Sequence, residues 1–121
     1  MVGKTWFERS DACCNVAYEG VSHAESDCQV LTVSPRAVSG MRLDWQPINA
    51  NQNQYVPDGA VTLGNDEFHG NLFSCRIRDS NGDFMSGQTW FPRDDGACCS
   101  VEYGSEEVHG SACELLVQTR C

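Results

Sequence analysis

The run Gly87-Gln88-Thr89-Trp90-Phe91, followed by Cys98-Cys99 and Cys113, occurs twice in the chain. The earlier copy opens with Gly3-Lys4-Thr5-Trp6-Phe7 and continues to Cys28. When one inserted residue, Gly96, is allowed, 14 of the 29 paired positions in 3–31 and 87–116 are identical. Self-similarity of this extent indicates two structural units related by an approximate symmetry axis.

The residues between the two copies, about 34 to 86, have no second version in the chain. The sequence therefore predicts a half repeat at residues 1–33 and one full repeat at residues 43–118. At 121 residues the chain is expected to form one domain, residues 1–121, with a core of its own.

Charge excludes several classes of partner. The formal net charge is −9, and the eight Lys and Arg residues are scattered without a basic block. Nucleic acids and anionic membrane surfaces both attract clustered basic residues, so neither is an expected partner. No apolar stretch is long enough to span a bilayer, and membrane insertion is not predicted. No signal peptide is visible before the first copy, which suggests either a mature form or a non-classical export route.

Eight cysteines in 121 residues predict disulfides, an oxidising compartment and a secreted protein. Adjacent cysteines on a strand point to opposite faces, so the members of each Cys-Cys pair need different partners. One member of Cys13-Cys14 is expected to bond Cys28, and one member of Cys98-Cys99 to bond Cys113. The remaining members would find Cys75 and Cys121. No free thiol is expected, and no Cys-x₂₋₄-Cys knuckle suggests zinc.

Strand patterns dominate both copies. Cys14, Val16 and Tyr18 alternate with three other residues in a period of two, and residues 98–103 repeat the pattern. A polar turn follows in each copy, and we expect the second strand of each hairpin at residues 27–33 and 112–118. A short Thr-Trp-Phe strand precedes each hairpin.

The unrepeated middle also reads as β-structure. Strands are predicted at residues 41–45 and 72–78, and a turn leading into a strand at residues 56–61. Residues 46–54 are expected to be an exposed polar loop and residues 63–70 a polar bend. Asn81-Gly82 is the strongest hairpin signal in the chain. The predicted fold is all-β: a disulfide-rich antiparallel sandwich or barrel-like domain with an internal pseudo-two-fold repeat.

The sequence contains no complete match to the calcium-binding, catalytic or phosphate-binding motifs considered. The run Asp79-Ser80-Asn81-Gly82-Asp83 resembles the start of an EF-hand, but position 6 of that loop would be Phe84 and position 12 would be Trp90. The chain has no Gly-x-Ser-x-Gly elbow and no Gly-rich phosphate loop. The sequence therefore predicts no enzyme, no cofactor and no metal site.

A set of polar side chains in and around the middle of the chain has the chemistry of a sugar site. Sugar hydroxyls both donate and accept hydrogen bonds, so carboxylates, amides and cationic groups beside aromatic rings suit them. The candidate residues are Asn65, Asp66, Arg76, Asp83, Gln88 and Lys4, the last two occupying the same position in the two copies.

The chain resembles the DM-nine repeat proteins, which include invertebrate mannose-binding lectins and the N-terminal region of natterin-like toxins. The matching runs are Trp45, Val56-Pro57-Asp58-Gly59-Ala60-Val61, Gly64-Asn65-Asp66, Leu72-Phe73 with Arg76, Gly82-Asp83, Ser86-Gly87-Gln88, Tyr103-Gly104-Ser105-Glu106 and Cys113-Glu114-Leu115-Leu116-Val117. The N-terminal piece, from Gly3-Lys4 to Val33, matches only the second half of the repeat.

The resemblance implies a β-rich module that holds glycans of the mannose or galactose type. It assigns the sugar to Asp66, Asp83 and Gln88, where Gln88 replaces a lysine of the family that Lys4 keeps. It further implies a lectin of innate recognition, acting as a homodimer because agglutination requires two sites per particle. The alternative is an interaction or toxin-associated module that has lost sugar binding.

Overall fold

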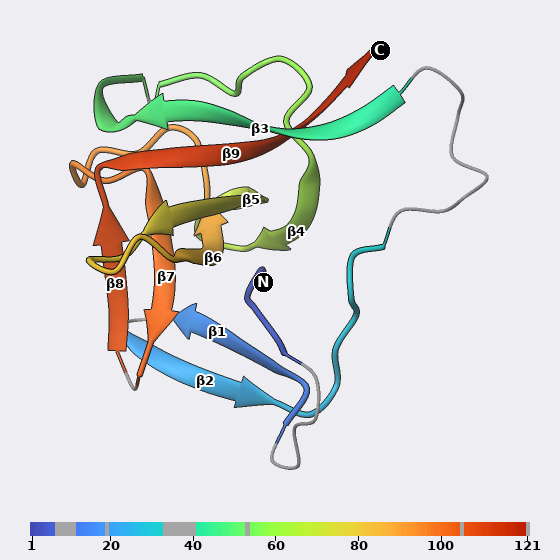
Figure 1. Ribbon diagram of the computed structural model, residues 1–121, viewed down its shortest axis with the longest axis vertical. Helices are drawn as coiled ribbons and strands as arrows, with labels where there is room; N and C mark the ends of the chain where they lie inside the picture. Colours follow the sequence, from blue (N-terminus) through green and yellow to red (C-terminus); the bar gives the residue numbers. More distant parts are fainter. Residues whose placement is uncertain (7–11, 19, 33–40, 53, 105, 121) are drawn as a thin grey trace.

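A computed structural model of the protein describes every residue except 7–11, 19, 33–40, 53, 105 and 121. The described residues form one antiparallel sheet in the order β1-β2-β8-β7-β6-β5-β9-β3, with β4 paired to β5 (Figure 1). The strands are β1 (Cys14–Tyr18), β2 (Val21–Glu25), β3 (Met41–Asn49), β4 (Thr62–Asp66), β5 (Gly70–Arg78), β6 (Phe84–Thr89), β7 (Cys99–Tyr103), β8 (Glu106–Gly110) and β9 (Ala112–Arg120). This confirms the predicted all-β antiparallel fold.

The helical content of the described residues is one 3₁₀ turn, η1 (Ala50–Gln52). Among these residues, no helix has the length and apolar character that crossing a membrane requires.

The sheet bends sharply at β6. Cys75 on β5 and Cys99 on β7 lie on either side of β6, yet a disulfide joins them and their Cα atoms are 5.9 Å apart. Residues two strands apart in a flat sheet would be about 10 Å apart, because neighbouring strands are separated by about 4.8 Å. The bend rolls the sheet, so that β3 and β9 cross above β6, β7 and β8 in Figure 1.

Gly87 makes this bend possible. It pairs with Cys75 on one side and Val101 on the other, in the middle of the rolled region. A Cβ atom at residue 87 would collide with the carbonyl oxygen of Ser100 and with the side chain of Val101. Only a residue without a side chain therefore allows β7 to approach β6 so closely.

The core lies inside the roll, where the inward faces of β5, β7 and β9 meet. Its members are apolar or disulfide-bonded and at most 7% exposed: Ile48, Phe73, Cys75, Ile77, Cys98, Cys99, Val101, Cys113, Leu115 and Val117. Burial of these side chains from strands far apart in the sequence holds the rolled sheet together.

The two copies make equivalent local contacts. A Cβ atom at Gly3 would collide with Asn15 and Val16, just as one at Gly87 would collide with Ser100 and Val101. The disulfides Cys13–Cys28 and Cys98–Cys113 span the same separation of 15 residues. Superposition of the complete units stays a prediction, because Phe7, Arg9 and Asp11 of the first copy lie outside the described residues.

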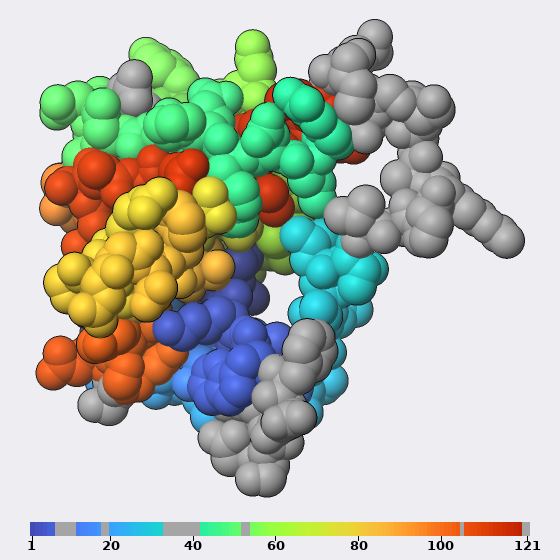
Figure 2. Space-filling view, viewed as in Figure 1, coloured from blue at the N-terminus to red at the C-terminus, as the bar shows by residue number. Residues whose placement is uncertain are grey.

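The N-terminal copy packs directly on the second copy. Figure 2 shows the dark-blue N-terminal residues lying against the surface formed by the later strands. The N–H of Val2 donates to Oε1 of Gln88, at 2.8 Å, and Val21 on β2 pairs with Glu106 on β8. The first copy therefore extends the sheet that the second copy belongs to.

The disulfides follow the expected logic of adjacent cysteines. Cys98 bonds Cys113 and Cys99 bonds Cys75, so the two neighbours are linked in different directions. In the first copy Cys13 bonds Cys28. The remaining predicted bridge involves Cys121, which lies outside the described residues. Within that limit, the prediction of disulfides is confirmed.

Several predicted boundaries are wrong. The second strand of the first hairpin is β2, at Val21–Glu25, whereas residues 27–32 form no strand. Gly20, with φ of +82°, reverses the chain at once, so that Tyr18 pairs with Val21. In the second copy β8 likewise precedes the predicted strand at residues 112–118, which belongs to the longer β9.

The unrepeated middle also differs from its predicted pattern in places. Residues 46–49, expected in an exposed loop, continue β3 because β9 offers a partner along its whole length, and Ile48 is buried. The expected bend at 63–70 is in part the strand β4. In the expected strand at 56–61, Ala60 forms only an isolated bridge with Val117. A hairpin at Asn81-Gly82 is confirmed between β5 and β6, with Gly82 at φ of +87°. The loop is longer than the two-residue turn that Asn-Gly predicts, because the last paired residues are Arg78 and Phe84.

The two equally spaced disulfides allow a matched stability test. Each closes a loop of 15 residues, so loss of either bridge should cost about 3 kcal/mol through the unfolded chain. Cys98 and Cys113 are also buried, whereas Cys13 and Cys28 are half-buried. We expect Cys98→Ala/Cys113→Ala to lose about 1 kcal/mol more than Cys13→Ala/Cys28→Ala in urea unfolding, because it leaves a core cavity. Equal losses would contradict this difference.

The glycine at the bend gives a second test. Gly87→Ala should lower the free energy of unfolding by at least about 2 kcal/mol, because its methyl group would displace the backbone of β7. Gly64→Ala is the control, since its nearest neighbours would lie at ordinary contact distances of 3.5 Å or more. The control should change stability by less than about 1 kcal/mol. A tolerated Gly87→Ala would show that β6 and β7 can separate.

Candidate functional site

A pocket of about 430 Å³ lies between the turn that joins β4 to β5 and the segment that joins β6 to β7. Its lining combines aromatic rings with carboxylates: Phe68, His69, Trp90, Phe91, Pro92, Asp94 and Asp95. The volume falls within the range of small-molecule sites. The first wall comes from the unrepeated middle of the chain and the second wall from the second copy.

Asp66 shapes the first wall. Its carboxylate accepts a hydrogen bond from the N–H of Phe68 at 3.0 Å and meets Nδ1 of His69 at 2.6 Å. The Phe68 bond first, and then the His69 bond, hold the pKa of Asp66 below its usual value. The turn closes at Gly70, where φ is +74° and β5 begins. Asp66 therefore fixes Phe68, which is 72% exposed, at the mouth of the pocket.

Trp90 forms the other wall and is held by stacked partners. The His69 ring lies over it with centroids 3.9 Å apart and planes inclined by 31°. The guanidinium carbon of Arg93 lies 4.0 Å from the indole ring, in cation–π contact. The contact between His69 and Trp90 joins the two walls, so the pocket is formed before any ligand enters.

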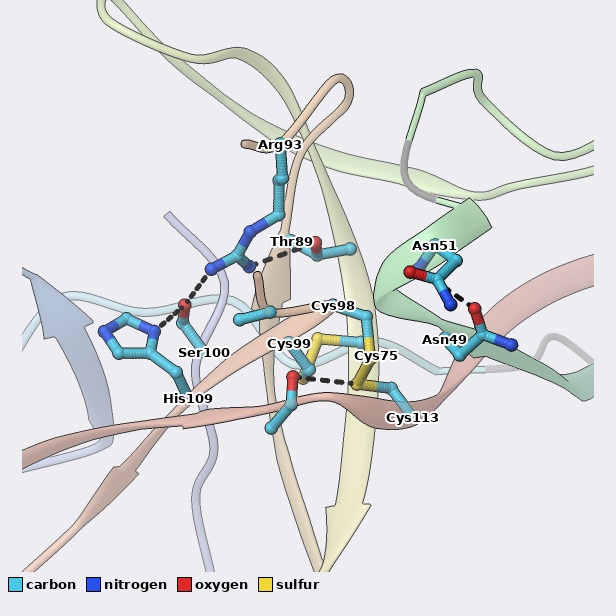
Figure 3. Close-up of a disulfide and its surroundings, with 12 residues drawn as sticks. Asn49, Asn51, Cys75, Thr89, Arg93, Cys98, Cys99, Ser100, His109 and Cys113 are labelled. Atoms are coloured by element: carbon cyan, nitrogen blue, oxygen red, sulfur yellow. Dashed lines mark hydrogen bonds between the residues drawn. A yellow bond between two sulfur atoms is a disulfide. The ribbon is translucent and has the colours of Figure 1, made fainter. Parts of the chain in front are cut away.

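Arg93 anchors the segment between β6 and β7. Its side chain is 0% exposed, and Nε and Nη2 donate to the carboxylate of Asp95 at 3.1 and 2.6 Å. Figure 3 shows the same guanidinium donating to Thr89 and Ser100, at 3.2 and 3.0 Å. The buried charge is thus paired, and four of its five N–H groups donate hydrogen bonds, as a low-dielectric environment favours. The bond from Arg93 also lowers the pKa of Asp95.

Ser100, His109 and Glu107 lie in series but do not form a nucleophilic site. Ser100 Oγ is 2.8 Å from Nδ1 of His109, and His109 Nε2 is 3.5 Å from Glu107. The hydroxyl of Ser100 is fully buried and already accepts a hydrogen bond from Arg93. A substrate carbonyl could not reach it, so this series serves to hold β8 on β7.

Two of the carboxylates predicted to share a sugar lie far apart. Asp66 pairs with Gly70 at the start of β5, whereas Asp83 lies beyond the turn that follows Arg78 at the end of β5. Eight residue steps along that strand span about 26 Å. Asp83 is exposed, and its N–H donates to Asp79 within its own turn. Asp66 and Asp83 of one chain therefore cannot hold the same sugar ring.

Gln88 and Lys4, the equivalent residues of the two copies, make reciprocal contacts. Gln88 is 5% exposed and its Nε2 donates to the carbonyl of Ala17 in the first copy, at 2.9 Å. Lys4 extends to Glu102 in the second copy, at 3.4 Å. Ala17 and Glu102 themselves occupy equivalent positions. The structure places both side chains at the junction between the copies rather than in the pocket lining.

Arg76 and Asn65 also lie outside the pocket lining. The Arg76 guanidinium lies 4.4 Å from the Trp45 ring and 3.7 Å from the Phe84 ring, and Nε donates to Glu114 at 3.1 Å. Arg76 thus links β3, β5, β6 and β9 on one sheet face. Asn65 is exposed, and its amide donates to Asn71 across β4 and β5, at 3.4 Å.

Of the six predicted site residues, the structure brings only Asp66 into contact with the pocket wall. The sequence pattern missed the aromatic lining because Phe68 and His69 look like ordinary loop residues. The sequence did single out Trp90 and Asp95, but only as residues that are identical in the two copies. One sequence signal could have indicated the pocket. The polar bend at residues 63–70 contains two adjacent aromatic residues, Phe68 and His69, that are not expected to pack in the core.

The fold and pocket define a disulfide-linked, rolled β domain with a preformed aromatic and acidic pocket. A scan against family models matches the DM9 repeat, over residues 1–109. This match covers most of the 121 residues, and the chain therefore belongs to the DM9 repeat family, as its resemblance predicted. DM9 domains are often associated with carbohydrate binding. Comparisons with curated proteins and with solved structures gave no match.

The neighbours Asp94 and Asp95 provide a test of the anchor. Asp95→Asn should lower the free energy of unfolding by about 1–2 kcal/mol near neutral pH, because it leaves the buried Arg93 without its charged partner. Asp94→Asn, at an exposed neighbouring position, should stay within about 0.5 kcal/mol of the wild type.

Acid should remove the difference between Asp95→Asn and the wild type. The pKa of Asp95 is lower in the folded state than its ordinary value of 3.8, so its stabilisation is complete above that value. It is lost as the pH falls through the folded pKa. Urea unfolding across the acid range should show the two proteins converging at low pH, and a constant gap would contradict the ion-pair assignment.

Proposed function

We propose that this protein is a carbohydrate-binding lectin and that the pocket between β4–β5 and β6–β7 holds the sugar. The observation that carries the proposal is the aromatic and carboxylate lining of a preformed pocket in a member of the DM9 repeat family. A sugar ring presents both apolar C–H faces and polar hydroxyls, so it needs both kinds of surface in one site.

Phe68 and Asp94 have the chemistry for these two roles. Phe68 is 72% exposed at the pocket, so its ring offers an apolar face for the C–H groups of a sugar. Asp94 is exposed, and no hydrogen bond or ion pair occupies its carboxylate within the described part of the chain. It can accept charge-assisted hydrogen bonds from sugar hydroxyls.

Asp66, the first site residue that the family resemblance implied, acts in this proposal through the pocket wall. Its carboxylate is 9% exposed and is already bonded to Phe68 and His69. Replacement of Asp66 would release the turn that carries both rings. Asp66→Ala is therefore expected to abolish sugar binding by displacing these rings, without any contact between Asp66 and the sugar.

The wider role in this proposal is extracellular recognition by a non-catalytic binding protein. The three disulfides among the described residues are typical of an oxidising compartment. Cross-linking of glycans requires at least two sites, so the lectin would act as a homodimer. Innate recognition of foreign glycans is the role that we assign to it.

One observation favours the alternative of an interaction module without sugar binding. Gln88, which the resemblance assigned to the sugar, is buried and both atoms of its amide group are bonded within the protein. The two functions are separated by whether any glycan binds. A glycan array followed by calorimetry with the best glycan makes that distinction directly.

Phe68→Ala is the decisive variant for the pocket. Because Phe68 is largely exposed, its loss should leave stability nearly unchanged but weaken sugar affinity about tenfold through lost stacking. Tyr55→Ala is the matched control, since Tyr55 is 84% exposed and is not part of the pocket. Calorimetry should show the control binding like the wild type. Equal affinity in all three proteins would remove the pocket as the sugar site.

A further inference from the structure

The charges at the pocket are unbalanced. Asp94 and Asp95 line it, and Asp66 lies behind its first wall. The His69 ring in the lining is bonded to Asp66, and the Arg93 guanidinium is 0% exposed and bonded to Asp95, Thr89 and Ser100. Its charge therefore offsets that of Asp95, while the carboxylate of Asp94 faces solvent with no partner among the described residues. The lining contains no lysine.

The aromatic lining and the net negative charge of the protein both favour a cationic ligand. Faces of aromatic rings attract cations, and the exposed ring of Phe68 lies in the same lining as Asp94. The Trp90 ring is already in contact with His69 and Arg93. The chain has a formal net charge of −9, which raises the local concentration of cations at its surface. A neutral sugar would use the stacking face and donate hydroxyl hydrogen bonds to the carboxylate, but it has no charge of its own for this field to attract.

We propose that the pocket selects a sugar that carries a protonated amine, of the 2-amino-2-deoxyhexose class, with the ammonium group held at Asp94 beside the aromatic rings. The proposal rests on the sugar-binding function proposed above. An ammonium group has three donors and a full positive charge, so it complements an acceptor-only carboxylate better than a hydroxyl does. The ring carbons of the same sugar retain the apolar contact with Phe68.

The N-acetylated sugar is the informative competitor. It has the same ring and the same position of substitution, but its amide carries no charge. A pocket that selects by apolar contact would prefer it, because its methyl group adds surface for stacking. A pocket that selects by charge would discriminate against it and against the neutral parent sugar to a similar degree.

Calorimetry with glucosamine, N-acetylglucosamine and glucose tests this selection at about pH 6, where an aliphatic amine is protonated. Glucosamine should bind the wild type at least about fivefold more tightly than either neutral sugar at low salt, and added salt should reduce this preference. Asp94→Asn should abolish the preference while retaining weak binding of all three sugars. Asp27→Asn, which removes the same charge from an exposed position outside the pocket, should behave like the wild type.

The other outcomes separate this inference from the function on which it rests. Equal affinities for the three sugars, or tightest binding of N-acetylglucosamine, would overturn selection by charge and leave sugar binding intact. A preference for glucosamine that persists in Asp94→Asn would overturn the assignment to Asp94. Binding of none of these sugars or of any glycan on the array would overturn the sugar-binding function itself.

Discussion

The close approach of β7 to β6 at Gly87 is the constraint on which the rest of the structure depends. Without a side chain at that position, the backbone of Ser100 can lie against β6, and Cys99 can reach across to Cys75. The covalent bond then spans a bend that would otherwise have to be maintained by the hydrogen bonds of only two β6–β7 residue pairs. The inward faces of β5, β7 and β9 meet only because the sheet is rolled in this way.

The same bend in the sheet also positions the second wall of the pocket. Its second wall belongs to the segment between Thr89 and Cys98, and both of these ends are fully buried. The buried Arg93 fills the space beneath the segment and fixes Asp95, while Trp90 is pinned by its stacked neighbours. A loop of this kind would ordinarily be mobile, but here its polar groups are satisfied from within. A rigid wall lowers the entropic cost of holding a ligand.

The sequence predicted the features that depend on local pattern. Period-two alternation located β1 and β7, Asn81-Gly82 located a hairpin, and the geometry of adjacent cysteines anticipated that Cys98 and Cys99 would have different partners. It missed β2 and β8, whose polar residues gain strand structure only from their neighbours. It also grouped Asp66 with Asp83, because residues close in sequence can lie at opposite ends of one long strand. The pocket depends on the tertiary approach of two loops, which no local pattern records.

The contacts of Gln88 and Lys4 restrict how the two copies can diverge. Where one copy has lysine, it faces a glutamate of the other, and where the other copy has glutamine, it faces an alanine and bonds to its backbone. A lysine at residue 88 would place an ammonium group in a position that is 5% exposed, without a carboxylate opposite. A glutamate at residue 17 would have to accompany it. Residue 4 is therefore matched to residue 102, and residue 88 to residue 17. A substitution at one member of either pair requires a compensating substitution at its partner in the other copy.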